Sequence, residues 1–387
     1  MELFVDVAVN SLNKVNEELC GDRVEVVKDE DTTIIVLADG LGSGVKANIL
    51  STLTTKIAAT MIKNGEDIYE TVDTIINTLP VCSVRGVAYS TFTIVVMNNN
   101  GRVYLAEYDN PPCFLHRNGR SIDIEREQIN INGKIIKVSD FTMQEGDILT
   151  SISDGVIHAG IGEVLNLGWQ WDEVNQFLAK VSQGKKCAKN MSNSLSQACL
   201  DLYGGRPGDD TTVVSIKTRK PEYVDLFTGP PEDQNKDQII VKKLMQGPGK
   251  KIVCGGTAAN IAEKVLHKKL KVDMSYMTAD LPPIAYLEGI DLVTEGVLTL
   301  DRTVKIIDKL ELGEISEINS RNPNGAEILS KILVDDCTHL TLWVGRAINP
   351  AHQNPNFPEG LNIKLNIVDK LIKCMEKLGK KVKINYV

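Results

Sequence analysis

The stretch Ala38-Asp39-Gly40-Leu41-Gly42-Ser43-Gly44 (ADGLGSG, residues 38–44) directly follows a short apolar run, Thr33 to Ala38, rich in β-branched residues. Such a run predicts a buried strand. The aspartate lies where that strand ends, next to glycines that let backbone and carboxylate approach one ion. A single Asp-Gly pair more often marks a turn, by roughly nine to one. The meaning of Asp39 therefore depends on the other acids of the chain.

Three further acidic sites share this setting. Asp22 follows a glycine ahead of the same strand, Asp154 lies in a Ser-Asp-Gly triplet after another apolar run, and Asp209 and Asp210 precede a third. Carboxylate, carbonyl and water oxygens are the ligands that Mg²⁺ and Mn²⁺ prefer. No Cys/His cluster has the spacing of a zinc site. Two such cations can polarise a phosphoryl oxygen and activate a shared water, so phosphate ester hydrolysis is the indicated chemistry.

The motifs ADGLGSG, GDILTSISDGV (146–156) and GDDTTVV (208–214), in this order and spacing, resemble the sporulation stage II protein E type of phosphatase. This type is a bacterial branch of the protein phosphatase 2C-like, metal-dependent serine/threonine phosphatases. YDNPPCFLHRNG (108–119) also resembles the family's hairpin that precedes the Ser-Asp-Gly strand. The resemblance covers about residues 1–217. It implies an α+β fold, with two antiparallel sheets sandwiched between helices and metal ions at one edge of the sheets.

Carried over position by position, the resemblance implies a site for two ions, Mn²⁺ or Mg²⁺. Asp39 would bridge both ions and Gly40 would offer its carbonyl oxygen to one. Asp154 and Asp209 would complete the other ion's site, and Asp22 would support the second metal. The expected catalytic residues are therefore Asp39, Asp154 and Asp209, and a metal-bridging hydroxide would attack the phosphorus.

The chain also departs from the family pattern. Leu41 stands where eukaryotic relatives have a histidine thought to act as general acid, so protonation of the leaving group would fall to metal-bound water. Ser43 stands where many bacterial relatives have histidine. Asp210 is expected to orient the neighbouring aspartate or a bound water. His158 either touches the substrate or is a packing or surface histidine.

The second half of the chain has a different pattern. Residues 219–238 are dense in prolines, acids and amides, which is typical of an interdomain connection. Beyond them strand-like and helical segments alternate, which predicts a smaller α/β domain with a mostly parallel sheet. We expect a phosphatase domain over 1–218 and an α/β domain, regulatory or ligand-binding, over 219–387.

Three loops of this second half follow predicted strands and would share one edge of the sheet. They contain Gly255-Gly256-Thr257, Glu295, and Arg346 followed by the proline-rich residues 349–355. Arg346 could clamp a phosphate or carboxylate and Glu295 could take a hydroxyl or amine, forming an anion or small-molecule pocket. The competing interpretation is a tight turn with Thr257 as N-cap, in a domain used for packing or dimerisation.

Composition excludes several classes of function. The net charge is −8 and the pI about 5.4, which argues against nucleic acid and against anionic lipid. No run approaches 18 apolar residues, so no membrane span is expected. The eight cysteines form no C-x-x-C pair and the N-terminus reads as a strand rather than a signal peptide, which favours the cytoplasm.

The leading hypothesis is a phosphatase acting on a phosphorylated bacterial regulatory protein, for which the family suggests an anti-sigma-factor antagonist or a similar switch protein. One alternative is a non-catalytic scaffold that binds a phosphoprotein under control of the second domain. Another is that the second domain is the main functional unit and handles nucleotides. A homodimer and the choice between Mn²⁺ and Mg²⁺ stay open at this point.

Overall fold

The computed structural model describes residues 2–79, 90–184, 187–274, 283–315, 318, 323–347 and 360–387, with the backbone alone at 360–362. The chain divides into two compact units, Met1–Lys220 and Pro221–Val387. Each unit is described by itself.

The first unit contains two groups of strands and two groups of helices. Its strands are β1 (Phe4–Leu12), β2 (Asp22–Lys28), β3 (Thr32–Gly40), β4 (Ser90–Asn98), β5 (Arg102–Tyr108), β6 (Phe114–Arg117), β7 (Arg120–Ile122), β8 (Glu127–Ile131), β9 (Lys134–Thr142), β10 (Ile148–Ile152) and β11 (Thr211–Arg219). Its helices are α1 (Gly44–Lys63), α2 (Ile68–Thr78), α3 (Asp154–Ile157), α4 (Trp171–Val181) and α5 (Ala188–Leu202).

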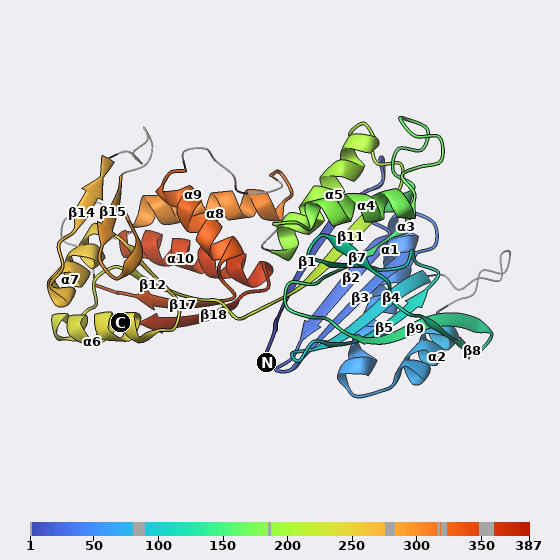
Figure 1. Ribbon diagram of the computed structural model, residues 1–387, viewed down its shortest axis with the longest axis horizontal. Coiled ribbons are helices and arrows are strands. Elements are labelled where there is room, and N and C mark those ends of the chain that lie inside the picture. Colours follow the sequence, from blue (N-terminus) through green and yellow to red (C-terminus); the bar gives the residue numbers. More distant parts are fainter. Residues whose placement is uncertain are drawn as a thin grey trace. The chain divides into compact units, whose positions relative to one another are not determined.

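These strands form two antiparallel sheets. One has the order β1-β11-β10-β6-β7 and the other the order β2-β3-β4-β5-β9-β8. Helices α1 and α2 cover the outer face of the larger sheet, and α3, α4 and α5 cover that of the smaller one (Figure 1). The predicted α+β sandwich of two antiparallel sheets is confirmed.

Alternation along β3 explains why the run before Asp39 is apolar at every position. Ile34 and Val36 face the core under α1 and α2, whereas Ile35 and Leu37 face the core between the sheets. Burying each such side chain stabilises the fold by about 1.5–3 kcal/mol. Because side chains alternate, Asp39 continues the row of Ile35 and Leu37 and lies on the side of β3 that faces the other sheet.

Several elements differ from the sequence prediction. Apolar periodicity predicts one helical stretch from about 45 to 80 and another from about 171 to 203. The first is two helices in the structure, because the chain turns at 64–67 and Asp67 caps α2 by accepting a bond from the Glu70 amide. The stretch from about 171 to 203 is likewise two helices, α4 and α5. Strands β2, β8 and β9 were not predicted, since polar side chains dominate β2 and β8, and β8 pairs with β9 through a short turn at Asn132-Gly133.

The second unit is an α/β domain. Its strands are β12 (Tyr223–Thr228), β13 (Lys250–Cys254), β14 (Lys271–Asp273), β15 (Ile284–Leu287), β16 (Ile290–Thr294), β17 (His339–Val344) and β18 (Lys381–Tyr386). Its helices are the short η1 (Gln234–Lys236), α6 (Asp237–Gln246), α7 (Gly256–Leu266), α8 (Val297–Glu311), α9 (Gly325–Asp335) and α10 (Gly360–Lys377).

The sheet of this unit has the order β14-β15-β16-β13-β12-β17-β18. The five strands from β16 to β18 are parallel, and β14 and β15 add an antiparallel hairpin at one edge. Helices α6 and α7 lie on one face and α8, α9 and α10 on the other (Figure 1). The predicted smaller α/β domain with a mostly parallel sheet is confirmed.

The interpretation of residues 219–238 as a connection was wrong. They contain β12, which pairs with both β13 and β17 in the middle of the sheet. Its side chains Val224, Leu226 and Phe227 are buried. The strand is only six residues long, and the acids and prolines on either side of it dominated the composition of the segment. None of the helices described in the structure is long and apolar enough to cross a membrane.

Candidate active site

The four predicted acidic sites lie at one end of the two sheets of the first unit. Asp22 begins β2 and is the cross-strand partner of Asp39 at the end of β3. Asp154 begins α3 immediately after β10, and Asp209 precedes β11, the antiparallel neighbour of β10. The charges of Asp22, Asp154 and Asp209 contribute to raising the pKa of Asp39, in agreement with the placement of these carboxylates at one end of the two sheets.

Glycines beside these acids allow segments of the backbone to approach closely. A Cβ atom on Gly40 would lie 2.0 Å from the carbonyl oxygen of Ala47 in α1. A Cβ atom on Gly155 would lie 2.1 Å from the carbonyl oxygen of Asp210. The Asp-Gly pairs are therefore required by packing at this edge, and each holds an aspartate against a second segment of the chain.

Asp22 is buried at 4% exposure, and neither of its carboxylate oxygens accepts a hydrogen bond. The hydroxyls of Ser153 and Thr212 lie near it: Thr212 donates to Ser11, whereas Ser153 accepts the amide of Thr212 and keeps its own proton to donate. Burial, partly offset by these hydroxyls, raises the pKa of the Asp22 carboxyl to about 7. An unpaired buried carboxylate is costly, so Asp22 calls for a cation or a proton.

Asp39 and Asp154 are only partly buried, but their pKa values are raised as well. Burial, followed by the charges of neighbouring aspartates, raises the pKa of the Asp39 carboxyl to about 9. Burial and the charge of Asp209 also raise the pKa of Asp154. Like charges held together in a low-dielectric site disfavour one another's ionisation, which is the expected state of a cation site before the cation binds.

The residues fit a hard divalent cation. Asp22, Asp39, Asp154 and Asp209 offer only oxygen ligands, as Mg²⁺ and Mn²⁺ prefer, and Asp22 has both oxygens free. Across the described residues, no three His, Cys, Asp or Glu side chains converge closely enough to enclose an ion as they stand. Small side-chain movements of mutually repelling carboxylates would be needed to close ligands around the metal.

Asp210 has a different role from its neighbour. Its carboxylate accepts the backbone amides of Lys14, at 3.0 Å, and Gly21, at 2.8 Å. It thereby fixes both ends of the loop between β1 and β2, which carries Asp22 into the site. Its own amide donates to Asp209 Oδ1 at 3.0 Å. Asp210 therefore positions the segments around the acids, and each of its oxygens accepts a backbone amide.

The same loop brings two charged side chains that the sequence analysis missed. Lys14 Nζ lies 3.6 Å from Asp209 Oδ1, and the two side chains are 37% and 41% exposed. Glu17 accepts a hydrogen bond of 2.7 Å from the hydroxyl of Ser43, in the glycine-rich turn before α1. Nothing in the local sequence marks these residues, because their partners lie in distant segments of the chain.

His158 is the residue that follows α3. It is half-buried and lies close enough to Asp154 to lower the pKa of that carboxyl, while its Nδ1 atom is buried without a hydrogen-bond partner. This position beside the acids is compatible with either of the two interpretations of His158.

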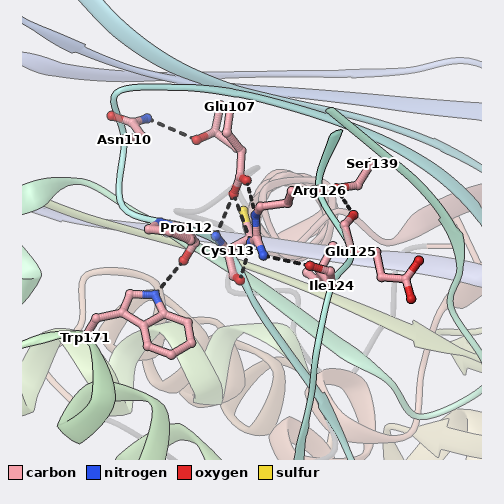
Figure 2. Close-up of polar contacts among 10 residues, drawn as sticks. Glu107, Asn110, Pro112, Cys113, Ile124, Glu125, Arg126, Ser139 and Trp171 are labelled. Carbon is pink, nitrogen blue, oxygen red and sulfur yellow. Dashed lines mark hydrogen bonds and ion pairs between the residues drawn. The ribbon is translucent and has the colours of Figure 1, made fainter. Parts of the chain in front are cut away.

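The turn between β5 and β6, residues 109–113, is fixed beside this edge by several side chains (Figure 2). Glu107 forms an ion pair of 2.6 Å with Arg126 and accepts the amide of Cys113 at 2.6 Å. The indole of Trp171 donates to the carbonyl of Pro112 at 2.9 Å. Asn110 accepts a hydrogen bond from Thr91, the cross-strand partner of Asp39.

A cavity of about 240 Å³ beside the turn is lined by Glu107, Asp109, Asn110, Pro112, Ile135 and Lys137.

The site predicted in the second unit is only partly assembled. Gly255 and Glu295 follow the adjacent parallel strands β13 and β16, and a Cβ atom on Gly255 would lie 3.7 Å from the Cα atom of Gly296. A Cβ atom on Gly256 would have open space around it. Arg346 follows β17, which β12 separates from β13, and it stacks on Tyr386 of β18.

The assignment of Thr257 as N-cap was wrong. Helix α7 begins at Gly256 and its N-cap is Gly255, whose φ of 117° favours glycine. Thr257 is one residue inside the helix, because the glycine pair makes the turn before it is reached. The proline-rich residues 349–355 lie outside the described residues.

One family model and several solved structures are similar to parts of this chain. The family model described as Stage II sporulation protein E (SpoIIE) matches residues 29–219. No curated protein gives a match to the chain. Among solved structures, the phosphatase domain with a fragment of the regulatory domain of SpoIIE from Bacillus subtilis is 19% identical, with a TM-score of 0.48, covering 57% of this chain and 63% of that one. The RsbU and RsbW domains of a Mycobacterium tuberculosis protein are 18% identical, with a TM-score of 0.48, covering 62% of this chain and 67% of theirs.

The fold and the acidic cluster define the first unit as a domain of the metal-dependent protein serine/threonine phosphatase class. Within that class, residues 29–219 are a phosphatase segment of the SpoIIE type. The matched segment ends at the boundary between the two units, and no part of the second unit falls within it.

Proposed function

We propose that the protein hydrolyses phosphoserine or phosphothreonine monoesters on another protein, using two divalent cations, Mn²⁺ or Mg²⁺. The single observation that carries this proposal is the cluster of Asp22, Asp39, Asp154 and Asp209, in which Asp22 is buried with both oxygens unsatisfied. Its position within a SpoIIE-type segment supports the choice of reaction.

Each residue of the cluster has a role in this proposal. Asp39 lies between the acids of the two sheets and would contact both cations, with the Gly40 carbonyl as a further ligand. Asp154 and Asp209 would hold one cation and Asp22 would support the other. The cations would supply polarisation of the phosphoryl group and activation of water. Asp210 keeps the β1–β2 loop in place through the amides of Lys14 and Gly21.

The substrate is proposed from the family of the segment. The family resemblance of the motifs suggests a bacterial regulatory phosphoprotein, such as an anti-sigma-factor antagonist or a similar switch protein. Residues of the second unit would then act in regulation or ligand binding rather than in the hydrolysis, because all the clustered acids belong to the first unit.

The test is hydrolysis of p-nitrophenyl phosphate with Mn²⁺, with Mg²⁺ and with EDTA, for the wild type, Asp39→Asn and Asp209→Asn. We expect metal-dependent turnover that falls by more than about a hundredfold in both variants, since even residues that only support metal ligands cost roughly 10- to 100-fold. Asp123→Asn is the matched control, because Asp123 is exposed and remote from the cluster in sequence. A phosphorylated switch protein then serves as the macromolecular substrate.

Metal binding is measured separately by calorimetric titration with Mn²⁺. Absence of both binding and turnover in the folded wild type would refute the proposal. Binding of Mn²⁺ together with a phosphoprotein but without turnover would instead identify a non-catalytic scaffold.

A further inference from the structure

The strand order of the second unit contains a reversal. The chain starts at β12 and proceeds outward through β13 to β16, and it then returns to the other side of β12 for β17 and β18. In open parallel sheets, ligands bind outside the carboxyl ends of the two strands at which the direction reverses. Those strands are β12, which ends at Thr228, and β17, which ends at Val344.

A lysine reaches this point from α10. Lys364 Nζ donates to the carbonyl oxygen of Gly345, directly after β17. A Cβ atom on Gly229, directly after β12, would lie 2.5 Å from the same Nζ. The ammonium group therefore occupies space that Gly229 leaves open between the two strand ends. Burial lowers the pKa of Lys364, and the carbonyl of Gly345 is its hydrogen-bond acceptor.

An arginine lies on the other side of the β17 end. Alternation along the strand puts Arg346 on the same face as Val344, whose cross-strand partner is Tyr386. The guanidinium carbon lies 4.2 Å from the centre of the Tyr386 ring, and the Arg346 amide donates to Val387 at 3.0 Å. Stacking of this kind fixes the plane of the guanidinium and leaves its N–H groups available.

Neither cation forms an ion pair with a carboxylate in the described part of the chain. Other lysines of the unit do: Lys251 lies 2.9 Å from Asp225 and Lys250 lies 3.0 Å from Asp336. A partly buried ammonium without a counter-charge is unfavourable. Lys364 is such an ammonium, whereas Arg346 is an exposed guanidinium on the other side of the same strand end. Two cations without a carboxylate partner among the described residues, placed together at the reversal of the sheet, indicate that their anion is a ligand.

We propose that the second unit binds a small molecule carrying a phosphate or polyphosphate group at the carboxyl ends of β12 and β17, where Lys364 and Arg346 contact the phosphate oxygens. Lys364 supplies a compact charge with free donors, and Arg346 supplies a planar pair of donors that matches two oxygens of one phosphate. This site is separate from the glycine turn at 255–257, which lies across β12 and adds no cation. The proposal does not depend on the phosphatase activity of the first unit.

The experiment is calorimetric titration of the full chain with pyrophosphate, with ADP and with citrate, in EDTA and in an Asp39→Asn background so that the acidic cluster takes up no phosphate through a metal. We compare Lys364→Met and Arg346→Met with Lys370→Met, which removes an exposed lysine of the same helix. We expect pyrophosphate or ADP to bind and the first two variants each to raise Kd about tenfold or more. Lys370→Met should leave Kd unchanged.

Thermal melting checks that the variants are folded. Arg346→Lys keeps the positive charge but removes the planar donors, so it tests the contribution of the guanidinium geometry to binding. No binding of either phosphate compound, or equal binding by wild type and the two methionine variants, would overturn the proposal. Citrate binding as tight as pyrophosphate, through the same two residues, would overturn the assignment to phosphate.

Discussion

Asp22 lies in a buried environment that destabilises an ionised carboxylate without a partner. The side chain is buried, neither of its oxygens accepts a hydrogen bond, and it lies opposite Asp39 at the end of β3. In the absence of metal the folded state therefore retains a proton here that the unfolded chain would release. The same arrangement makes the first unit depend on its cation for stability as well as for chemistry.

The first prediction concerns pH and Asp22→Asn. Because the folded pKa, about 7, lies above the ordinary value of 3.8, the folded state binds more protons between these values, and stability falls as pH rises through this window. Without metal, the Asp22→Asn variant should melt close to wild type at about pH 3.5, where the wild-type carboxyl is largely protonated in the unfolded as well as the folded state, and above wild type at pH 8.5. A shift of this size corresponds to about 4 kcal/mol.

The measurement is thermal unfolding in EDTA at several pH values, repeated with Mn²⁺. The metal should raise the wild-type Tm at pH 7.5 and raise that of Asp22→Asn much less, because the variant lacks the charge that the cation offsets. Asp123→Asn serves as the control for an exposed aspartate. A difference in Tm between Asp22→Asn and wild type that does not change with pH would contradict this account.

Adjacent aspartates allow a second, paired prediction. Asp210→Ala removes the acceptor of two backbone amides, and each charge-assisted bond contributes about 1.5–3 kcal/mol, so the first unit should lose at least about 2 kcal/mol of stability. Asp209→Ala removes a half-exposed group and should abolish turnover with little loss of stability. Chemical denaturation with p-nitrophenyl phosphate kinetics separates the two effects, and the same loss of stability in both variants would argue against distinct roles.

The β5–β6 turn is held by a buried ion pair, Glu107–Arg126, which can be compared with the exposed ion pair Arg102–Asp140. Glu107 is 2% exposed and its partner Arg126 is 21% exposed, whereas Arg102 and Asp140 are 65% and 48% exposed in an ion pair of similar length. Removing one member of a buried pair leaves an uncompensated charge, which costs about 3–5 kcal/mol. Exposed pairs contribute little.

We therefore expect Arg126→Met to destabilise the protein by about 3 kcal/mol or more and to release the turn that Cys113 and Pro112 belong to. Arg102→Met should leave the denaturation midpoint unchanged. Equilibrium unfolding in urea measures both. Equal midpoints for the two variants would show that Glu107 is satisfied without its arginine.

Elements were predictable from the sequence where the signal is local. The hairpin at 98–101 and the helix α6 follow from turn residues and periodicity, and both are present in the structure. Strand β2 was not predicted because it is a polar edge strand. Strand β12 was not predicted because six residues between acids and prolines show too little periodicity. Its central place in the sheet comes from pairing with β13 and with the distant β17, which no local pattern contains.

The same distinction applies to the candidate site. The aspartates were predictable because the motifs around them, taken together, are specific and because Asp-Gly pairs at strand ends have a physical reason. Lys14, Glu17 and Lys364 were not, since each becomes relevant only through a partner in a distant segment. Thr257 was wrongly predicted as the N-cap of α7, because the sequence does not reveal which of the two glycines adopts the positive φ.

The two units of the molecule are self-contained in the features that matter for the proposed reaction. The acids, the loop held by Asp210 and three hydrophobic cores all lie within Met1–Lys220. Conversely, β12 begins only after Pro221 and is needed in the middle of the other sheet. Truncation between Lys220 and Pro221 should therefore leave a complete phosphatase unit. Truncation at residue 238 would leave β12, a strand of the second unit's sheet, attached to the first unit.

Met1–Lys220 produced alone should unfold in one cooperative transition and hydrolyse p-nitrophenyl phosphate in a metal-dependent manner, within a few-fold of the full chain per molecule. The physical reason is that every group proposed to hold the cations has its supporting contacts inside this unit. Calorimetry and steady-state kinetics on the truncated and full-length proteins check both parts, with Asp39→Asn in the truncated protein as the blank. A truncated protein that is folded but inactive would show that the second unit contributes to catalysis, and a gain of tenfold or more would show that the second unit restrains it.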